Sequence, residues 1–437
     1  MAANVTVVNL IPRSLSGETN QDSEPNLAVN PANPQLMAAS AFTPNPAGSG
    51  DAPIFVSTDG GNTWSLQAIV PSDQETADIT LRFGGSSNNL YAGIIRTPIV
   101  SNAPRLNILR TSNVLSGSPM DVLVDRTGNG VDQPYIQAAT FPDGQGGSAD
   151  LVVCGDNDFN HQPQSATMDV SGSAGASPAP FANSVVDVRP AAGGDAPSIR
   201  PAIHADGTVY GAFLRRVSGT TNNNLRYDVV VVRDDNRGSS HPSFAALTDP
   251  ADGLVGTRVA QNRLIPFLNQ PVFGQERIGS TLTISVDPRD GQSGNVFLAW
   301  ADRLGKTDYT IHLVKSLDRG ATWSRADLLS VTNATNPAVA VNGNGMVGFV
   351  YQQLTGAFKP NHVSAANRWV THFRTSTDGG TTWTDLVLAT TPANVPRAAG
   401  LPYLGDYLHL MAIGNDFYGV FCANNQQISG RLSDCGS

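Results

Sequence analysis

Seven segments of this 437-residue chain open with a polar residue and continue as short apolar strands. Four of them share the pattern x-Pro-x-apolar-x-apolar. The opening residues are Glu24, Asp78, Gln133, Arg200, Thr281, Asn336 and Asp406. A guanidinium binds a carboxylate through two parallel hydrogen bonds, and a carboxyl group can transfer a proton. If the seven strands meet, Arg200 with Glu24, Asp78 and Asp406 is expected to bind a substrate that carries a carboxylate.

The connections between these segments carry further groups of the same kinds. Glu276 and Arg277 lie in one long connection, Arg397 and Tyr403 lie in another, and Asp302 follows the apolar strand NVFLAW. A concave mouth with convergent polar groups is the usual place of a binding site. We therefore expect these residues near the seven openings, although the adjacency of Glu276 and Arg277 favours a surface ion pair.

One stretch suggests a metal. DRTGNGVD alternates oxygen-bearing side chains with glycines, as calcium loops do, which makes Asp125, Asn129 and Asp132 weak candidate ligands for a structural calcium. An ordinary Asn/Gly/Asp turn is the competing interpretation. The seven histidines are isolated from one another and form no zinc or iron pattern, so no other cofactor is expected.

Three copies of one octapeptide stand out: STDGGNTW from Ser57, SLDRGATW from Ser316 and STDGGTTW from Ser376. In such a turn the aspartate accepts hydrogen bonds from backbone amides, a glycine takes the positive φ, and the tryptophan packs between sheets. We therefore expect Trp64, Trp323 and Trp383 to be structural and to lie away from any ligand.

Each of the seven openings is followed by a second apolar strand, and the spacing between units closes through the two termini. Repeated units of this kind indicate a closed ring of sheets. We predict an all-β fold, a single β-propeller over residues 1–437 with seven four-stranded blades and six as the alternative. The N-terminal strand around Val5 to Leu10 is expected to close the last blade.

Composition narrows the possible partners. Charged residues are only 14% of the chain, the net charge is -9, and no run of Lys or Arg could follow a phosphate backbone, which argues against nucleic acid. No segment has the length and apolarity of a membrane span. We expect a soluble monomer. The first residues do not look like a signal peptide, so both a cytoplasmic protein and a secreted one lacking its signal stay open.

The octapeptide is the Asp-box, or bacterial neuraminidase repeat, and the chain resembles the sialidase-like propellers that carry it. The resemblance is sharpest where Ile199-Arg200-Pro201 precedes the strand DGTVYGAFLRR and then YDVVVVRDDNRG. Sialidases have an F/Y-R-I-P motif at the start of a comparable series of strands. By position, only Arg200 matches the arginine of that motif.

The resemblance implies roles for the other candidates. Sialidases bind the substrate carboxylate with an arginine cluster and use a tyrosine nucleophile that a glutamate activates, with an aspartate as acid and base. Arg200, Arg277 and Arg397 would form the cluster, Tyr403 or Tyr407 the nucleophile, Glu276 its partner and Asp302 the acid. The expected function is an exo-glycosidase acting on an acidic sugar. A non-catalytic glycan- or protein-binding propeller and a polysaccharide lyase are the alternatives.

Overall fold

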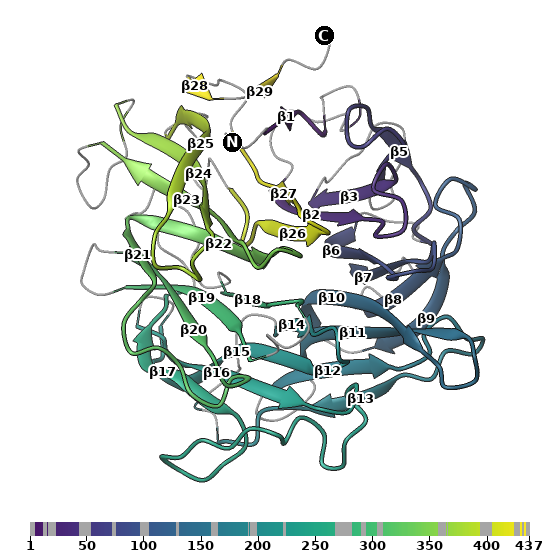
Figure 1. Cartoon of the computed structure of the whole chain (residues 1–437), viewed down its shortest axis with the longest axis horizontal. Coiled ribbons are helices and arrows are strands. Elements are labelled where there is room, and N and C mark those ends of the chain that lie inside the picture. The colour runs from purple at the N-terminus through teal and green to yellow at the C-terminus, as the bar shows by residue number, and fades with distance from the viewer. Residues whose placement is uncertain are drawn as a thin grey trace.

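The computed structural model shows an all-β ring of sheets around a central channel (Figure 1). The described residues are 5–11, 15, 23–42, 54–71, 76–96, 105–127, 131–158, 165–190, 192, 199–221, 224–266, 282–289, 294–303, 309–356, 364, 366–393, 404–423, 429–430 and 432–433. Among them, no helix is long and apolar enough to cross a membrane.

Six antiparallel blades follow one another around the ring. Their inner strands are β2 (Ser23–Val29), β6 (Thr76–Phe83), β10 (Val131–Pro142), β14 (Arg200–Ile203), β18 (Leu282–Val286) and β22 (Ala334–Val341). The second strands are β3 (Met37–Phe42), β7 (Leu90–Arg96), β11 (Ser148–Asp158), β15 (Val209–Ser218), β19 (Val296–Arg303) and β23 (Val347–Thr355). Each blade continues outward in chain order.

The outer half of each blade is built in the same way. The third strands are β4 (Ile54–Ser57), β8 (Arg105–Thr111), β12 (Ser165–Ser171), β16 (Arg226–Asp234), β20 (Tyr309–Ser316) and β24 (Arg368–Ser376). The fourth are β5 (Ser65–Gln67), β9 (Asp121–Thr127), β13 (Ala182–Val185), β17 (Thr257–Leu264), β21 (Leu329–Thr332) and β25 (Thr384–Pro392). The expectation of four-stranded blades is confirmed.

The predicted number of blades is wrong: among the described residues six blades are complete, which was the alternative. The seventh unit is only a two-stranded hairpin of β26 (His409–Ile413) and β27 (Asp416–Val420). It contacts β22 on one side and β2 on the other, and so fills the last sector of the ring (Figure 1). The two strands are present because their apolar residues pack on both neighbours, but no third strand pairs with β27 in the described part of the chain.

Closure of a blade by the N-terminal strand is not shown. β1 (Val7–Val8) pairs in parallel with β29 (Leu432–Ser433), and β28 (Ser429–Gly430) adds a fifth strand to the blade that ends with β25. Leu10 packs against a cluster of the first blade formed by Leu27, Val29, Met37 and Ala39, and Tyr418 and Val420 of β27 pack against the same cluster. The N-terminal segment therefore packs on the first blade through a side chain, while its backbone pairs with the C-terminal segment.

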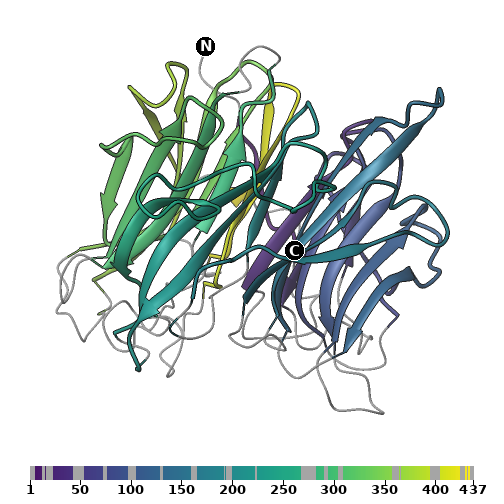
Figure 2. The ribbon, with the colours of Figure 1, turned by 90° about the horizontal axis from the view of Figure 1, so that it is seen from below.

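The core lies between the blades rather than within one layer. Strands that are apolar on both faces can bury both faces only by stacking sheet against sheet. One such cluster joins Tyr210 and Val231 to Leu298 and Trp300 of the next blade. The stacked sheets stand side by side when the ring is seen from its edge (Figure 2). This stacking holds the inner strands in fixed positions around the channel.

The three octapeptides form the same turn between the third and fourth strands of their blades. In the first copy, Asp59 Oδ1 accepts a hydrogen bond of 2.9 Å from the Thr63 backbone N–H. The Trp64 indole donates to the Gly61 carbonyl at 3.0 Å. Because the strands alternate in direction, these turns lie at the end of the blades opposite to the openings of the inner strands.

Three inner strands begin with the same backbone irregularity. Glu24, Gln133 and Asn336 each precede a proline and have a positive φ of 55°, 44° and 54°. The strand register shifts at each of these places, as in a β-bulge. A residue before proline normally stays extended, so these left-handed residues are strained. Each bulge thus lies at a buried polar residue near the start of an inner strand.

Candidate functional site

Arg200 opens β14 and lies at the centre of the site. Its guanidinium carbon is 4.3 Å from the centre of the Tyr135 ring and 5.1 Å from that of Tyr407. Burial lowers the pKa of Arg200, and the charges of Asp78 and Asp406 act in the opposite direction. The side chain is 3% exposed. A planar cation is therefore held between two aromatic rings and beside two carboxylates.

Tyr407 brings a hydroxyl group into the same place. It is 4% exposed, and its hydroxyl has no hydrogen-bond partner among the residues that the structure describes. Burial raises the pKa of Tyr407 well above its usual value, and the charges of Asp78 and Glu24 raise it further. The phenol is thus kept protonated beside the charges of Asp78 and Glu24.

The segment that carries Tyr407 is fixed from two sides of the ring. The Gln133 side-chain amide donates to Asp406 Oδ2 at 2.9 Å, and the Asn336 amide donates to the Gly405 carbonyl at 3.2 Å. Gly405 has a φ of 87°, and a Cβ there would lie 2.5 Å from the Glu24 backbone nitrogen. Only glycine fits this close approach, which sets Tyr407 beside Glu24.

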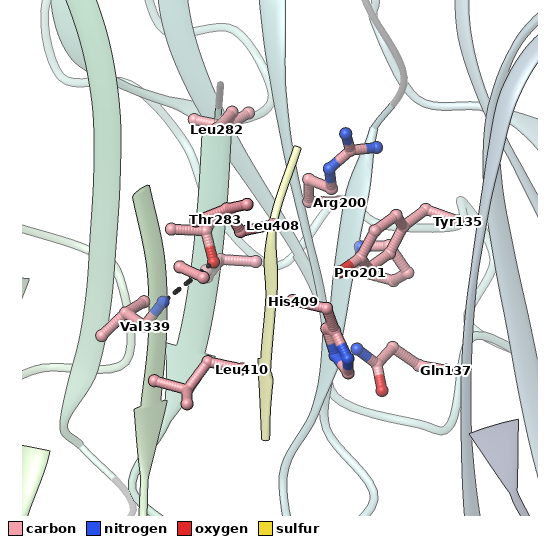
Figure 3. Close-up of a pocket in the computed structure, with 12 residues that line it drawn as sticks. Tyr135, Gln137, Arg200, Pro201, Leu282, Thr283, Val339, Leu408, His409 and Leu410 are labelled. Carbon is pink, nitrogen blue, oxygen red and sulfur yellow. Dashed lines mark hydrogen bonds between the residues drawn. The ribbon is translucent and has the colours of Figure 1, made fainter. Parts of the chain in front are cut away.

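Deeper in the channel, Arg82 of β6 and His409 of β26 are in contact. Arg82 Nε also donates to Gln137 Oε1 at 2.9 Å. Figure 3 shows Arg200 beside Tyr135 near one end of the cavity, and His409 and Gln137 facing each other further along it. The cavity that these residues line has a volume of about 30 Å³. That space holds one or two water molecules and no sugar ring.

Glu24, Asp78, Arg200 and Asp406 are close enough to influence one another or Tyr407 electrostatically at the openings of the inner strands, and their role in binding stays a prediction. Five further candidates lie outside the described residues, namely Glu276, Arg277, Thr281, Arg397 and Tyr403. Their roles stay predictions. Of the two tyrosines considered for the nucleophile, Tyr407 is the one that the structure describes.

Asp302 is engaged in an ion-pair cluster between two blades. Its carboxylate pairs with Arg263 Nε at 2.5 Å and with His312 Nε2 at 3.1 Å. The Trp300 indole donates to it at 2.9 Å. Hydrogen bonds with Asp302 and Asp327 raise the pKa of His312 to about 9 against the opposing effect of burial, so the imidazole is a cation at neutral pH. None of these partners belongs to the ring of strand openings, and a catalytic role for Asp302 stays untested.

Nothing in the described residues forms a metal centre. No group of three or more His, Cys, Asp or Glu residues in the described part of the chain is arranged to hold an ion. Asp125 accepts hydrogen bonds from Arg105 at 2.7 Å and from Asn107 at 3.1 Å. Asn129 lies outside the described residues, as does the side chain of Asp132. The calcium hypothesis is therefore untested.

Sequence reasoning missed three residues of the channel: Arg82, Tyr135 and His409. Tyr135 follows the Gln133-Pro134 opening, and Arg82 and His409 interrupt inner strands that are otherwise apolar. A polar residue at an inward position of an inner strand is a usable signal. It cannot tell which residues meet, because they come from different blades.

No family model matches the sequence, and no curated protein matches it. Solved structures resemble its fold. A GH93 α-L-arabinofuranosidase of Fusarium graminearum in complex with arabinobiose is 10% identical, with 80% of this chain and 92% of that chain covered and a TM-score of 0.48.

Two further structures show a similar degree of likeness. An α-L-arabinanase of Penicillium chrysogenum complexed with arabinobiose is 12% identical, with 90% and 99% covered and a TM-score of 0.46. A Hadza microbial sialidase is 11% identical, with 90% of this chain and 61% of that chain covered and a TM-score of 0.40. At this level of likeness, the function has to be argued from the residues of the chain itself.

Proposed function

We propose that the chain is a glycosidase of the sialidase-like kind that acts on an acidic sugar at the channel mouth. The observation that carries this proposal is the buried Tyr407 hydroxyl, which has no hydrogen-bond partner among the described residues. The charges of Asp78 and Glu24 raise the pKa of this hydroxyl, and the charge of Arg200 acts in the opposite direction. A nucleophile beside a base, with a cation at hand for the substrate, is the arrangement that covalent glycoside hydrolysis requires.

Each described group has a task in this reaction. Arg200 binds the carboxylate of the sugar through its planar guanidinium. Glu24 accepts the proton of the Tyr407 hydroxyl as the phenolic oxygen bonds to the anomeric carbon. The bond from that carbon to the leaving group breaks, and the departing oxygen takes the proton that Glu24 received. Water then cleaves the glycosyl-tyrosine bond and returns a proton to Tyr407, so the anomeric configuration is retained.

The substrate must reach a site that is buried in this structure. Glu24, Arg200 and Tyr407 are all less than a tenth exposed, and the cavity beside them is about 30 Å³. A sugar ring therefore enters only when the mouth opens, and closing over the substrate would exclude water from the reaction. Binding without turnover is the behaviour expected of the alternative, a propeller that recognises acidic glycans or proteins.

The test is a panel of fluorogenic aryl glycosides: a sialoside, a glucuronide and a neutral arabinofuranoside. We expect hydrolysis of an anionic member, and a kcat about 10²–10⁴-fold lower for Tyr407→Phe. Tyr210→Phe is the matched control, because Tyr210 is also fully buried with a hydroxyl that lacks a partner in the described residues. It should keep full activity.

Two results would contradict the proposal. One is a lack of hydrolysis across the panel together with specific binding on a glycan array, which would favour the binding propeller. The other is cleavage of a polyuronate with formation of an unsaturated product, which would favour a lyase.

A further inference from the structure

Arg82 is a buried cation whose hydrogen bonds all end on uncharged acceptors. It is 5% exposed. The acceptors are the Leu81 carbonyl at 2.7 Å, Gln137 Oε1 at 2.9 Å, the Leu27 carbonyl at 3.1 Å and Asn26 Oδ1 at 3.5 Å, and the guanidinium also contacts His409 Nε2 and hydrogen-bonds to Tyr135. Among the described residues, no carboxylate contacts its guanidinium. A buried charge is normally paired with an opposite one, since an isolated ion loses its hydration energy without compensation.

The surroundings of Arg82 do not supply that charge. Burial lowers the pKa of Arg82, and the opposing contribution comes from Tyr135, which hydrogen-bonds to Arg82 and is not a carboxylate. The two carboxylates that act on Arg200, Asp78 and Asp406, are at the mouth and do not act on Arg82. The deeper part of the channel therefore has an excess of positive charge within the described residues.

His409 adds an excess of hydrogen-bond donors. Its Nδ1 faces the Leu27 backbone N–H at 3.4 Å, and its Nε2 faces Arg82. Both neighbours are donors, whereas a neutral imidazole has only one acceptor nitrogen. Burial and the charge of Arg82 hold the pKa of His409 well below its usual range, so the ring stays neutral. An additional acceptor would resolve this mismatch.

The cavity beside these residues has the size of a small ion. It is about 30 Å³ and is lined by Arg200, Gln137 and His409, the last two being partners of Arg82 (Figure 3). A monatomic anion or one or two waters would fill it, whereas a sugar acid would not. Gln137 and Thr283, which also line the cavity, are partly exposed, so an ion can reach it from solvent.

We propose that this cavity of the central channel is a binding site for a monatomic anion, chloride in ordinary solution, held between Arg200 and the Arg82–Gln137–His409 group. The anion offsets the positive charge of Arg200 at the cavity wall and of Arg82 behind Gln137 and His409, and it ties the inner strands β10, β14 and β26 together. This site is separate from the proposed glycosidase reaction, and its test uses no carbohydrate.

The first test measures thermal unfolding of the full chain in sodium chloride and in sodium gluconate at equal ionic strength, since gluconate is too large for the cavity. Chloride should raise Tm by on the order of 2 °C. Gln137→Glu places a carboxylate where the amide oxygen already meets Arg82, so this variant should lose the difference. Gln145→Glu makes the same charge change in an exposed turn and should keep it.

The second test locates the ion in crystals of the unaltered chain grown in bromide. We expect an anomalous peak between Gln137, Arg200 and His409. A water at that position with no anomalous signal would overturn the proposal. Equal Tm values in chloride and gluconate, or an undiminished difference in Gln137→Glu, would overturn it as well.

Discussion

The Gln133 side chain of β10 donates a hydrogen bond of 2.9 Å to the carboxylate of Asp406, a residue 273 positions further along the chain. Gln133 holds a strained left-handed conformation to do so. The bond fixes the segment that brings Tyr407 to Arg200. Gln133 is therefore a positioning residue for the proposed site.

Replacing Gln133 with Leu should destabilise the chain by about 1–3 kcal/mol, because a buried carboxylate loses a donor. It should also lower kcat more than it raises KM, since it displaces Tyr407 rather than a contact with substrate. Urea unfolding and steady-state kinetics measure both effects. Gln353→Leu removes an exposed amide that donates to the Thr332 carbonyl, and should change neither. Equal effects of the two variants would contradict the positioning role.

Arg200→Lys should weaken binding of an acidic glycan by at least about tenfold, because lysine keeps the charge but loses the planar fork. Folding should be retained, with a loss of about 1–2 kcal/mol from the contacts with Tyr135 and Tyr407. Isothermal titration checks the binding. Arg237→Lys is the control, since Arg237 lies 4.6 Å from the Phe141 ring in a turn at the other end of the blades. If both variants bind as the parent does, Arg200 does not hold a carboxylate.

Removing the indole of Trp64, Trp323 or Trp383 by substitution with Ala should cost about 3 kcal/mol of stability and leave ligand binding unchanged. Each indole is partly buried against an apolar cluster and donates a hydrogen bond within its own turn. Denaturant unfolding measures the loss of stability. Glycan binding is measured separately, at a temperature where the variant is folded. Lost binding with intact stability would place these turns at the functional site.

Asp156 should make stability depend on pH. It is fully buried beside Asp169, and both carboxylates contact Arg126. Burial raises the pKa of Asp156 to about 7 from its usual 3.8. Because the folded chain holds this proton more tightly than the unfolded chain, its stabilising contribution is complete below about pH 4 and is lost as the pH rises through about 7.

Asp156→Asn should therefore flatten the decrease in unfolding free energy between about pH 5 and about pH 8. Urea unfolding at the two pH values measures the change. Asp121→Asn, at an aspartate that is mostly exposed in its ion pair with Arg110, is the matched control and should leave the slope as it is. A slope in Asp156→Asn as steep as in the parent would assign the pH dependence to another group.

Much of this architecture follows from local patterns that act within one strand or one turn. Local geometry depends on adjacent residues, so it can be predicted from the sequence. Examples are the strand openings at Glu24 and Arg200 and the turns that end in Trp64 and Trp383. Two-sided apolar strands likewise require stacked sheets. The sequence alone therefore predicted a propeller of four-stranded blades with polar groups around its channel.

The tertiary structure decided what depends on partners far away in the chain. Whether the strands around Leu410 and Phe417 become a full blade depends on which segments pair with β27, and β1 pairs with β29 instead. Arg82, Tyr135 and His409 meet only because two blades and the β26–β27 hairpin converge on one axis. The spacing of residues in the sequence does not predict such contacts. Each inner strand is specified by its own apolar pattern, whereas its position in the ring is determined by packing.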